Sequence, residues 1–273
     1  MTATLVLAAL LAPKVDLLAR LDDPRISESS GLAASPSRPG VWYTHNDSGD
    51  RARFFRFGED GRVTGTFQLT DARAIDWEDM AAARIAGKPR LYLADIGDNA
   101  SRRAEIQVYS VAEPEGVGRS LGSVQTFRIR YPDGAHDCEA FFVQPGTGAF
   151  WLITKARQGV PAAYVVRRPR AGTLQTAEKV ADLSLPVPAG MFGLITAADV
   201  SPDGRKVAIR TYGRVLLFQV RGRFEDWVRT EPVVLPSPAE FQGEAIGFSR
   251  DGQRLLTTSE GTPCPVSVIA PLP

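Results

Sequence analysis

The stretch Asp76-Trp77-Glu78-Asp79-Met80-Ala81 recurs in altered form along the whole chain. Its clearest repeat is Asp137-Cys138-Glu139-Ala140-Phe141-Phe142, and weaker copies begin at Glu28, Leu194 and Gln242. The five equivalent positions are Ser30, Glu78, Glu139, Thr196 and Glu244. They are 48, 61, 57 and 48 residues apart. A period of about fifty residues is typical of a repeat architecture.

Within each repeat, short runs rich in Val, Ile, Phe, Tyr and Thr alternate with turns that contain Gly, Pro or Asp-Gly, a pattern that predicts β-strands. The first four repeats each contain four such runs. The last repeat contains only three, whereas residues 15–21 form an unassigned strand before the first repeat. We therefore predict an all-β, five-bladed β-propeller over residues 13–273, whose last blade is completed by the N-terminal strand. A six-bladed ring is the alternative.

The composition excludes several classes of protein. The chain has 273 residues, 44% of them hydrophobic and 23% charged, with a net charge of +1. A nucleic-acid-binding protein would need a basic face, so no nucleic-acid partner is expected, and we expect a monomer. The absence of a polybasic run also argues against a membrane anchor of that type.

The N-terminus contains an apolar run at residues 4–12 that is too short to span a bilayer. It resembles the apolar part of a secretory signal peptide, although no Lys or Arg precedes it. We expect residues 1–12 to form a signal-peptide-like segment and the protein to be secreted or periplasmic; otherwise it is cytoplasmic. Cys138 and Cys264 lie in separate repeats, so two free, buried thiols are expected, with a disulfide as the alternative.

Polar residues converge on one end of the predicted channel. In each blade the start of the innermost strand and the end of its antiparallel neighbour lie at the same face. The strand starts supply the candidate metal ligands Glu28, Ser30, Asp76, Glu78, Glu139 and Glu244. The ends of the second strands supply the candidate pocket residues Asn46, Asp47, Asp95, Asp98, Asn99, Lys155, Arg210, Tyr212 and Glu260.

This arrangement favours a divalent cation. Carboxylates crowded around a narrow axis raise one another's pKa, and calcium, which takes six to eight oxygen ligands, relieves the repulsion. Two histidines and no paired cysteine spacing give little support for zinc. The alternative is that the acids accept hydrogen bonds from backbone amides of the next blade or pair with Lys155 and Arg210.

The candidate catalytic residues are Glu78, Glu139, Lys155, Arg210 and His45. Lys155 and Arg210 both end second strands, so we expect them side by side, where they suit an anionic substrate; each can instead neutralise a neighbouring acid. His45 and His136 lie near this face as possible general bases or as solvated loop histidines. Familiar hydrolase motifs are absent.

Two functions remain open. The first is a binding module for a small-molecule or anionic ligand, or for a protein partner, with a calcium-binding pocket. The second is a metal-dependent hydrolase of a small anionic ester, phosphoester or lactone. We favour the binding module because no pair of nucleophile and base is evident.

The opening motifs resemble those of the SdiA-regulated propeller family. Glu28-Ser29-Ser30-Gly31, Asn46-Asp47 and Asp76-Trp77-Glu78-Asp79 match its Glu-x-Ser-Gly, Asn-Asp and Asp-x-Glu patterns, and Asp137-Cys138-Glu139-Ala140 extends the match. The resemblance implies an exported propeller, which in some members holds calcium. The ring of acids is also similar in architecture to calcium-dependent, five-bladed apyrases, but no nucleotide-hydrolase motif is shared.

Overall fold

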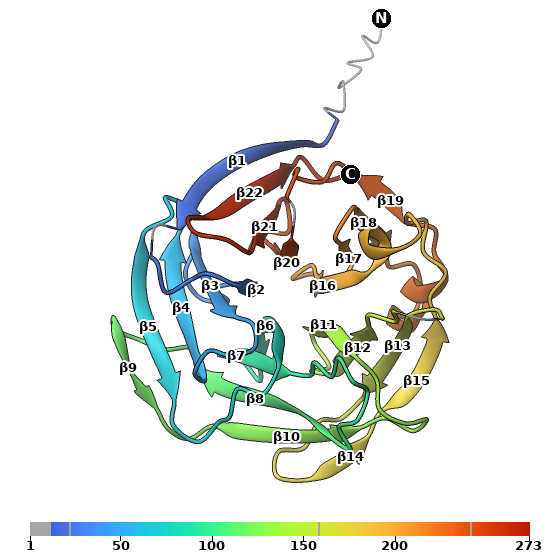
Figure 1. The fold of residues 1–273 in the computed structure, drawn as a ribbon, viewed down its shortest axis with the longest axis horizontal. Coiled ribbons are helices and arrows are strands. Elements are labelled where there is room, and N and C mark those ends of the chain that lie inside the picture. The colour runs from blue at the N-terminus through green and yellow to red at the C-terminus, as the bar shows by residue number, and fades with distance from the viewer. Residues whose placement is uncertain (1–11, 22, 158, 241) are drawn as a thin grey trace, which may run out of the picture.

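Five separate sheets surround one axis in the computed structural model, which describes residues 12–21, 23–157, 159–240 and 242–273 (Figure 1). The protein is a five-bladed β-propeller, as predicted, and the six-bladed alternative is wrong. Each sheet has a core of four antiparallel strands, which lie one after another at increasing distance from the axis. No helix in the described part of the chain has both the length and the apolar character needed to cross a bilayer.

The blades follow the chain in order. Blade 1 consists of β2 (Ser29–Ala34), β3 (Val41–Asn46), β4 (Arg53–Gly58) and β5 (Val63–Leu69). Blade 2 consists of β6 (Trp77–Ile85), β7 (Lys88–Asp95), β8 (Ile106–Ala112) and β10 (Gln125–Arg130). Blade 3 consists of β11 (Cys138–Val143), β12 (Phe150–Thr154), β13 (Ala162–Val166) and β15 (Glu178–Asp182). Blade 4 consists of β16 (Ile195–Val200), β17 (Lys206–Thr211), β18 (Val215–Gln219) and β19 (Val233–Leu235).

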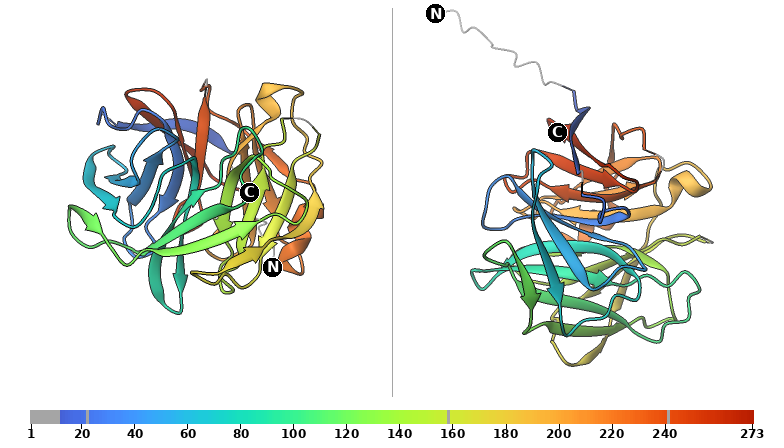
Figure 2. Two further views of the ribbon diagram at one scale, coloured as in Figure 1. Left: turned by 60° about the horizontal axis from the view of Figure 1, so that its bottom comes forward. Right: turned by 60° about the vertical axis from the view of Figure 1, so that its left-hand side comes forward.

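Blade 5 joins the two ends of the chain. It consists of β20 (Gly243–Phe248), β21 (Leu255–Ser259), β22 (Cys264–Ala270) and β1 (Lys14–Leu21). Strand β1 pairs antiparallel with β22 from Lys14 opposite Ala270 to Leu21 opposite Cys264. Figure 1 and the right-hand view of Figure 2 show blue β1 alongside the red strands of this blade. The predicted closure is confirmed; the expected signal-peptide-like segment, apart from residue 12, lies outside the described residues.

Two short strands were not predicted. β9 (Gly118–Leu121) adds in parallel to β5 of blade 1, and β14 (Leu174–Thr176) adds in parallel to β10 of blade 2. Each comes from the connection of a later blade and crosses to the outer edge of the preceding sheet. Their side chains are mostly exposed, so they lack the apolar alternation that marks a strand in the sequence. They cover edges that would otherwise be open to pairing.

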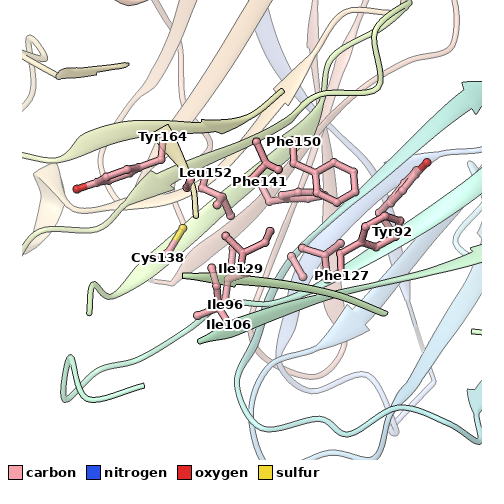
Figure 3. Close-up of a cluster of buried hydrophobic side chains, with 14 of the residues drawn as sticks. Tyr92, Ile96, Ile106, Phe127, Ile129, Cys138, Phe141, Phe150, Leu152 and Tyr164 are labelled. Carbon is pink, nitrogen blue, oxygen red and sulfur yellow. The ribbon is translucent and has the colours of Figure 1, made fainter. Parts of the chain in front are cut away.

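Apolar side chains fill the space between neighbouring blades. Between blades 2 and 3, the ring of Phe150 packs edge-on against Tyr92, Phe127 and Phe141 at centroid distances of 4.9–5.5 Å (Figure 3). Burying one such side chain contributes about 1.5–3 kcal/mol. Two 3-10 helices, η1 (Met191–Gly193) and η2 (Phe224–Arg229), lie in the connections of blade 4, and η2 places Trp227 in the next interblade core. Cys138 and Cys264 are buried and free, as expected.

The innermost strand of every blade carries one β-bulge. The pairing register shifts at a single residue in β2, β6, β11, β16 and β20. The bulged residues are Ser30, Glu78, Glu139, Thr196 and Glu244, the same five positions that the sequence repeats align. A bulge leaves its residue unpaired and re-aims the side chain. The repeat in sequence therefore corresponds to a repeated backbone irregularity at one end of the channel.

Candidate functional site

Two rings of residues define the end of the channel that we call the acidic mouth. The five bulged residues form the first ring. The second, the strand-end ring, follows the second strand of each blade and consists of Asp47, Ile96, Lys155, Tyr212 and Glu260. In each blade its backbone N–H donates to the carbonyl that lies two residues before the bulge, over 2.9–3.2 Å. This repeated hydrogen bond holds the two rings together.

Three carboxylates meet between blades 1 and 2. One oxygen from each of Asp47, Asp76 and Glu78 lies within 4.8 Å of the others. Gly97 makes the approach possible, because a Cβ atom at that position would lie 2.2 Å from Glu78 Oε1 and 2.6 Å from Asp76 Oδ2. None of the three carboxylates forms an ion pair with a Lys or Arg among the described residues. We call this group the carboxylate cluster.

Burial and mutual repulsion perturb the carboxylate cluster. Desolvation, followed by the charges of Asp47 and Asp137, raises the pKa of Asp76 to about 6. Desolvation and the neighbouring Glu139 raise the pKa of Glu78 well above its usual range. Burial also raises the pKa of Asp47. The charged forms are therefore disfavoured unless a cation joins them.

Beside the cluster lies a chain of polar contacts across blades 3 to 5. Lys155 Nζ lies 2.9 Å from Glu139 Oε1, and both side chains are about 5% exposed. Lys155 also donates to the Tyr212 hydroxyl over 3.4 Å and lies 5.4 Å from the centre of its ring. Burial raises the pKa of Glu244 in blade 5, and the charge of Lys155 opposes this rise. Desolvation outweighs the Lys155 charge and raises the pKa of Glu139 to about 7. Lys155 thus pairs with Glu139, which is one of several carboxylates at the acidic mouth.

Two further predicted acids lie at the rim of the acidic mouth. Glu28 is exposed. Glu260 is half-buried, and desolvation, with Glu244, Asp47 and Glu28 as further causes, raises its pKa to about 7. These residues add negative potential to the mouth from blades 1 and 5.

The hydroxyl of Ser30, by contrast, forms a hydrogen bond with the protein backbone. Its hydroxyl donates to the backbone carbonyl of Glu78 over 2.6 Å, and its counterpart Thr196 donates to the carbonyl of Gly243 over 3.0 Å. Both hydroxyls link one inner strand to that of the next blade.

Lys155 and Arg210 do not lie side by side, contrary to the expectation from the sequence. Arg210 lies two positions before the strand-end ring, within β17 and on the same strand face as Ala208, so its side chain points between blades 4 and 5. There it is 1% exposed and donates to the carbonyls of Ala245 and Thr258 over 2.8 and 2.9 Å, and it pairs with Glu240. The neighbour of Lys155 is Tyr212.

The histidines also differ from expectation. His45 is fully buried between blades 1 and 2, edge-on to Trp77 at 5.4 Å, and its Nδ1 lies 2.8 Å from the carbonyl oxygen of Asn46. Burial lowers the pKa of His45, so it is a core histidine and not a solvated base. His136 bonds Asp133 and Tyr164, 2.9 Å from each, outside the two rings.

Four other predicted pocket residues hold the loops that carry the site. Asn46 accepts from the backbone of Ser27 and Glu28, both over 3.2 Å. Asp95 is fully buried; it accepts from Asp76 N over 3.1 Å and pairs with Arg103 at 2.8 Å. Asp98 accepts from the backbone N–H of Arg103, and exposed Asn99 accepts from Arg157, each over 2.6 Å. These residues position Asp76 and its loop.

Sequence reasoning missed the role of Asp79. It is fully buried, and its Oδ2 accepts from Phe141 N of blade 3 over 2.9 Å and from Ala198 N of blade 4 over 3.2 Å. The carboxyl group therefore crosses the axis directly below the bulge ring. The sequence did contain a signal for this role. Asp79 follows Glu78 in the repeated motif, at a position where the other four repeats have Gly or Ala.

The donors at the acidic mouth suit a hard divalent cation. The carboxylate cluster offers only oxygen ligands, and burial followed by neighbouring acids raises the pKa of Asp76 and Glu78. Calcium and magnesium prefer such ligands, whereas zinc sites are usually built with His or Cys. The residues present therefore fit a calcium-type cation.

Comparisons with known proteins support the fold alone. No protein-family model matches the chain, and no curated protein matches it. Among solved structures it is similar to a gluconolactonase from Xanthomonas campestris, with a TM-score of 0.54 and 15% sequence identity over 96% of this chain and 90% of that one. The resemblance to the SdiA-regulated family thus stays a prediction, although the propeller that it implies is confirmed.

Proposed function

We propose that this propeller binds a divalent cation, calcium in the first place, at its acidic mouth and uses it to hold a small ligand. One observation carries the proposal: Asp47, Asp76 and Glu78 bring carboxylate oxygens within 4.8 Å of one another. Such a cluster of buried or half-buried carboxylates costs folding free energy unless a cation offsets it. Asp47, Asp76 and Glu78 would hold the ion.

The remaining polar groups of the mouth would bind the ligand. Lys155 is fixed by Glu139 and faces Tyr212, so it can donate to an anionic or carbonyl oxygen. Glu244 and Glu260 can accept from hydroxyl groups. This combination suits a small polyhydroxyl or carboxylate-bearing molecule.

A second candidate function is hydrolysis of a lactone or small ester. It is favoured by Glu139, whose pKa of about 7 allows it to hold or release a proton near neutral pH within reach of Lys155. A bound divalent cation supplies Lewis acidity toward a carbonyl oxygen. The similar solved structure is a gluconolactonase, which makes lactones the first substrates to test.

Calcium titration monitored by thermal unfolding tests the cation site. We expect calcium to raise the melting temperature, because a ligand that binds only the folded state stabilises it. Glu78→Gln and Gly97→Ala should abolish the rise, the latter because the added Cβ displaces both carboxylates. Glu115→Gln and Gly122→Ala are matched controls. Glu115 is exposed, and a Cβ atom added at Gly122 would have no neighbour closer than 4.0 Å. An identical melting temperature in calcium and in chelator would refute the proposal.

A substrate panel separates the two functions. Sugar lactones, carboxylic esters and phosphoesters should be assayed with the wild type, Glu78→Gln and Glu139→Gln. Turnover that is lost in both variants supports the hydrolase. Calcium binding without turnover of any compound supports the binding module.

We further propose that residues 13–273 act as one monomeric propeller domain and that residues 1–12 direct export. Cell fractionation, with mass spectrometry of the mature N-terminus, tests the second point. Recovery of the intact N-terminus in the cytoplasm would contradict it.

A further inference from the structure

A cavity lies at the end of the channel opposite the acidic mouth. It has a volume of about 350 Å³ and is formed where the five inner strands end. All five blades contribute to its wall, through Ala34, Arg84, Val143, Val200 and Phe248. We call it the far-end cavity. Its volume lies at the lower limit of the range of ligand-binding pockets, roughly 300–1,000 Å³.

Small side chains keep the far-end cavity open. Blades 1 and 2 line it with Ala33, Ala34, Ala82 and Ala83, where larger residues would fill the channel. Phe248, which is 2% exposed, and Val143 provide apolar walls. The interior is therefore suited to an apolar group.

Two arginines lie at the rim. Arg84 and Arg250 are both exposed and line the cavity. Arg84 donates through Nε to the carbonyl of Pro36 over 3.1 Å and through Nη1 to that of Gly87 over 2.8 Å, which leaves Nη2 for a ligand. Arg250 forms no side-chain hydrogen bond or ion pair within the described ranges of the chain. Guanidinium groups bind carboxylates with two parallel hydrogen bonds.

The carboxylate of Asp199 in the cavity wall repels a bound anion only weakly. Asp199 directs its oxygens to Val200 N over 2.8 Å and to Phe248 N over 2.7 Å. Two backbone donors thus compensate its charge. In the nearby turns, Asp203 and Asp251 accept hydrogen bonds from Ser201 and Ser249, respectively.

The far-end cavity is separate from the acidic mouth. Asp79 crosses the axis between them by its hydrogen bonds to blades 3 and 4. A ligand in one end therefore does not contact the other.

We propose that the far-end cavity binds a small monocarboxylic acid with an apolar body. The apolar body would lie among the alanines, Val143 and Phe248, and the carboxylate would bind Arg84 and Arg250 at the rim. This site is independent of the cation site and does not rest on the function proposed above.

Isothermal titration with octanoate tests the inference. The measurement is made in EDTA, so that no cation at the acidic mouth can bind the carboxylate. We expect saturable binding with one site, much weaker binding of octanol, which lacks the charge, and of acetate, which lacks the apolar body. The double variant Arg84→Gln/Arg250→Gln should weaken octanoate binding by about tenfold or more, and Ala82→Leu should abolish it by filling the cavity.

Arg221→Gln is the matched control, because Arg221 is exposed on the loop after β18 and is not part of the cavity lining. It should bind octanoate as the wild type does. Thermal unfolding confirms that each variant folds; if Ala82→Leu does not, the two surface arginines still decide the question. Equal affinity for octanol and octanoate, or wild-type affinity in the double arginine variant, would overturn the proposal, as would the absence of saturable binding.

Discussion

The two ends of the channel are built from the same five strands and differ in almost every property. At the acidic mouth each inner strand begins with a bulge that carries a polar side chain, and carboxylates outnumber the single buried lysine. At the far end the same strands finish as regular pairs with alanines, two valines and a phenylalanine, and the charges at the rim are arginines. Asp79 separates them.

This difference shows how one strand can serve two environments. A regular strand places alternate residues toward the channel, whereas a bulge adds one residue and changes that direction. Because each inner strand has its bulge at its start, polar residues can face the axis there without disturbing the apolar packing between blades farther along. The backbone irregularity, repeated five times, decides where the chemistry lies.

The largest effect is expected at the partition between the two ends. Asp79→Ala removes the acceptor of three buried N–H groups, those of Met80, Phe141 and Ala198. Each costs about 1–3 kcal/mol when left unpaired, and the lost volume adds to this. Asp79→Asn keeps one carbonyl acceptor and should cost about half as much. Urea unfolding measures both. A change below about 1 kcal/mol in Asp79→Ala would show that Asp79 is not the element that divides the channel.

The next effect concerns the charge of the acidic mouth. Lys155→Met leaves the Glu139 carboxylate buried without its partner, which typically destabilises by about 3–5 kcal/mol. The double variant Glu139→Gln/Lys155→Met should recover most of this loss, because neutral replacement of a buried pair is often tolerated. Urea unfolding at pH 8 provides the measurement. Equal stability of Lys155→Met and wild type would mean that the pair is already neutral.

A smaller effect, a few degrees in melting temperature, is expected from pH. The folded-state pKa values of Asp76, Glu139 and Glu260, about 6, 7 and 7, exceed the usual values near 4. Between about pH 4 and 7 the folded state therefore binds more protons, and these groups stabilise it less as the pH rises. A cation binds the deprotonated forms, so the calcium-induced rise in melting temperature should be larger at pH 8 than at pH 5. Equal rises at both values would contradict this account.

The smallest effect is expected at the two hydroxyl positions of the bulge ring. Ser30→Ala and Thr196→Val each remove one hydrogen bond to the next blade, worth about 1 kcal/mol. Both variants should keep the calcium response, because the hydroxyls act within the scaffold. If Ser30→Ala abolishes the response while Thr196→Val does not, Ser30 is a cation ligand, as the sequence pattern suggested.

The sequence predicted the fold because its signals are local and repeated. The spacing of Ser30, Glu78, Glu139, Thr196 and Glu244 indicated five units, and the unassigned strand at 15–21 indicated how the ring closes. Strands β9 and β14 escaped notice because exposed edge strands have no apolar pattern. Their existence depends on a neighbouring sheet edge, which no local stretch encodes.

The candidate site was predicted less completely. Repeat alignment grouped Asp47, Asp76 and Glu78 at one face, but it could not tell which way a side chain near a strand end points. Arg210 lies two residues before the position equivalent to Lys155, so it points between blades, and Tyr212 lies beside Lys155 instead. Likewise, no pattern shows that Gly97 must lack a Cβ atom for two carboxylates to meet; that depends on contacts between residues about twenty positions apart.

The join between β1 and β22 has a consequence for how the molecule is made. Synthesis proceeds from the N-terminus, so β1 leaves the ribosome long before its partner β22. Asp47, Asp76 and Glu78 all lie in the first two blades and are available early, whereas the circle can close only after β22 has been made. A chain that lacks β22 thus carries its cluster of negative charge on an open arc, and the ring can unfold as one cooperative unit only once β22 has paired with β1.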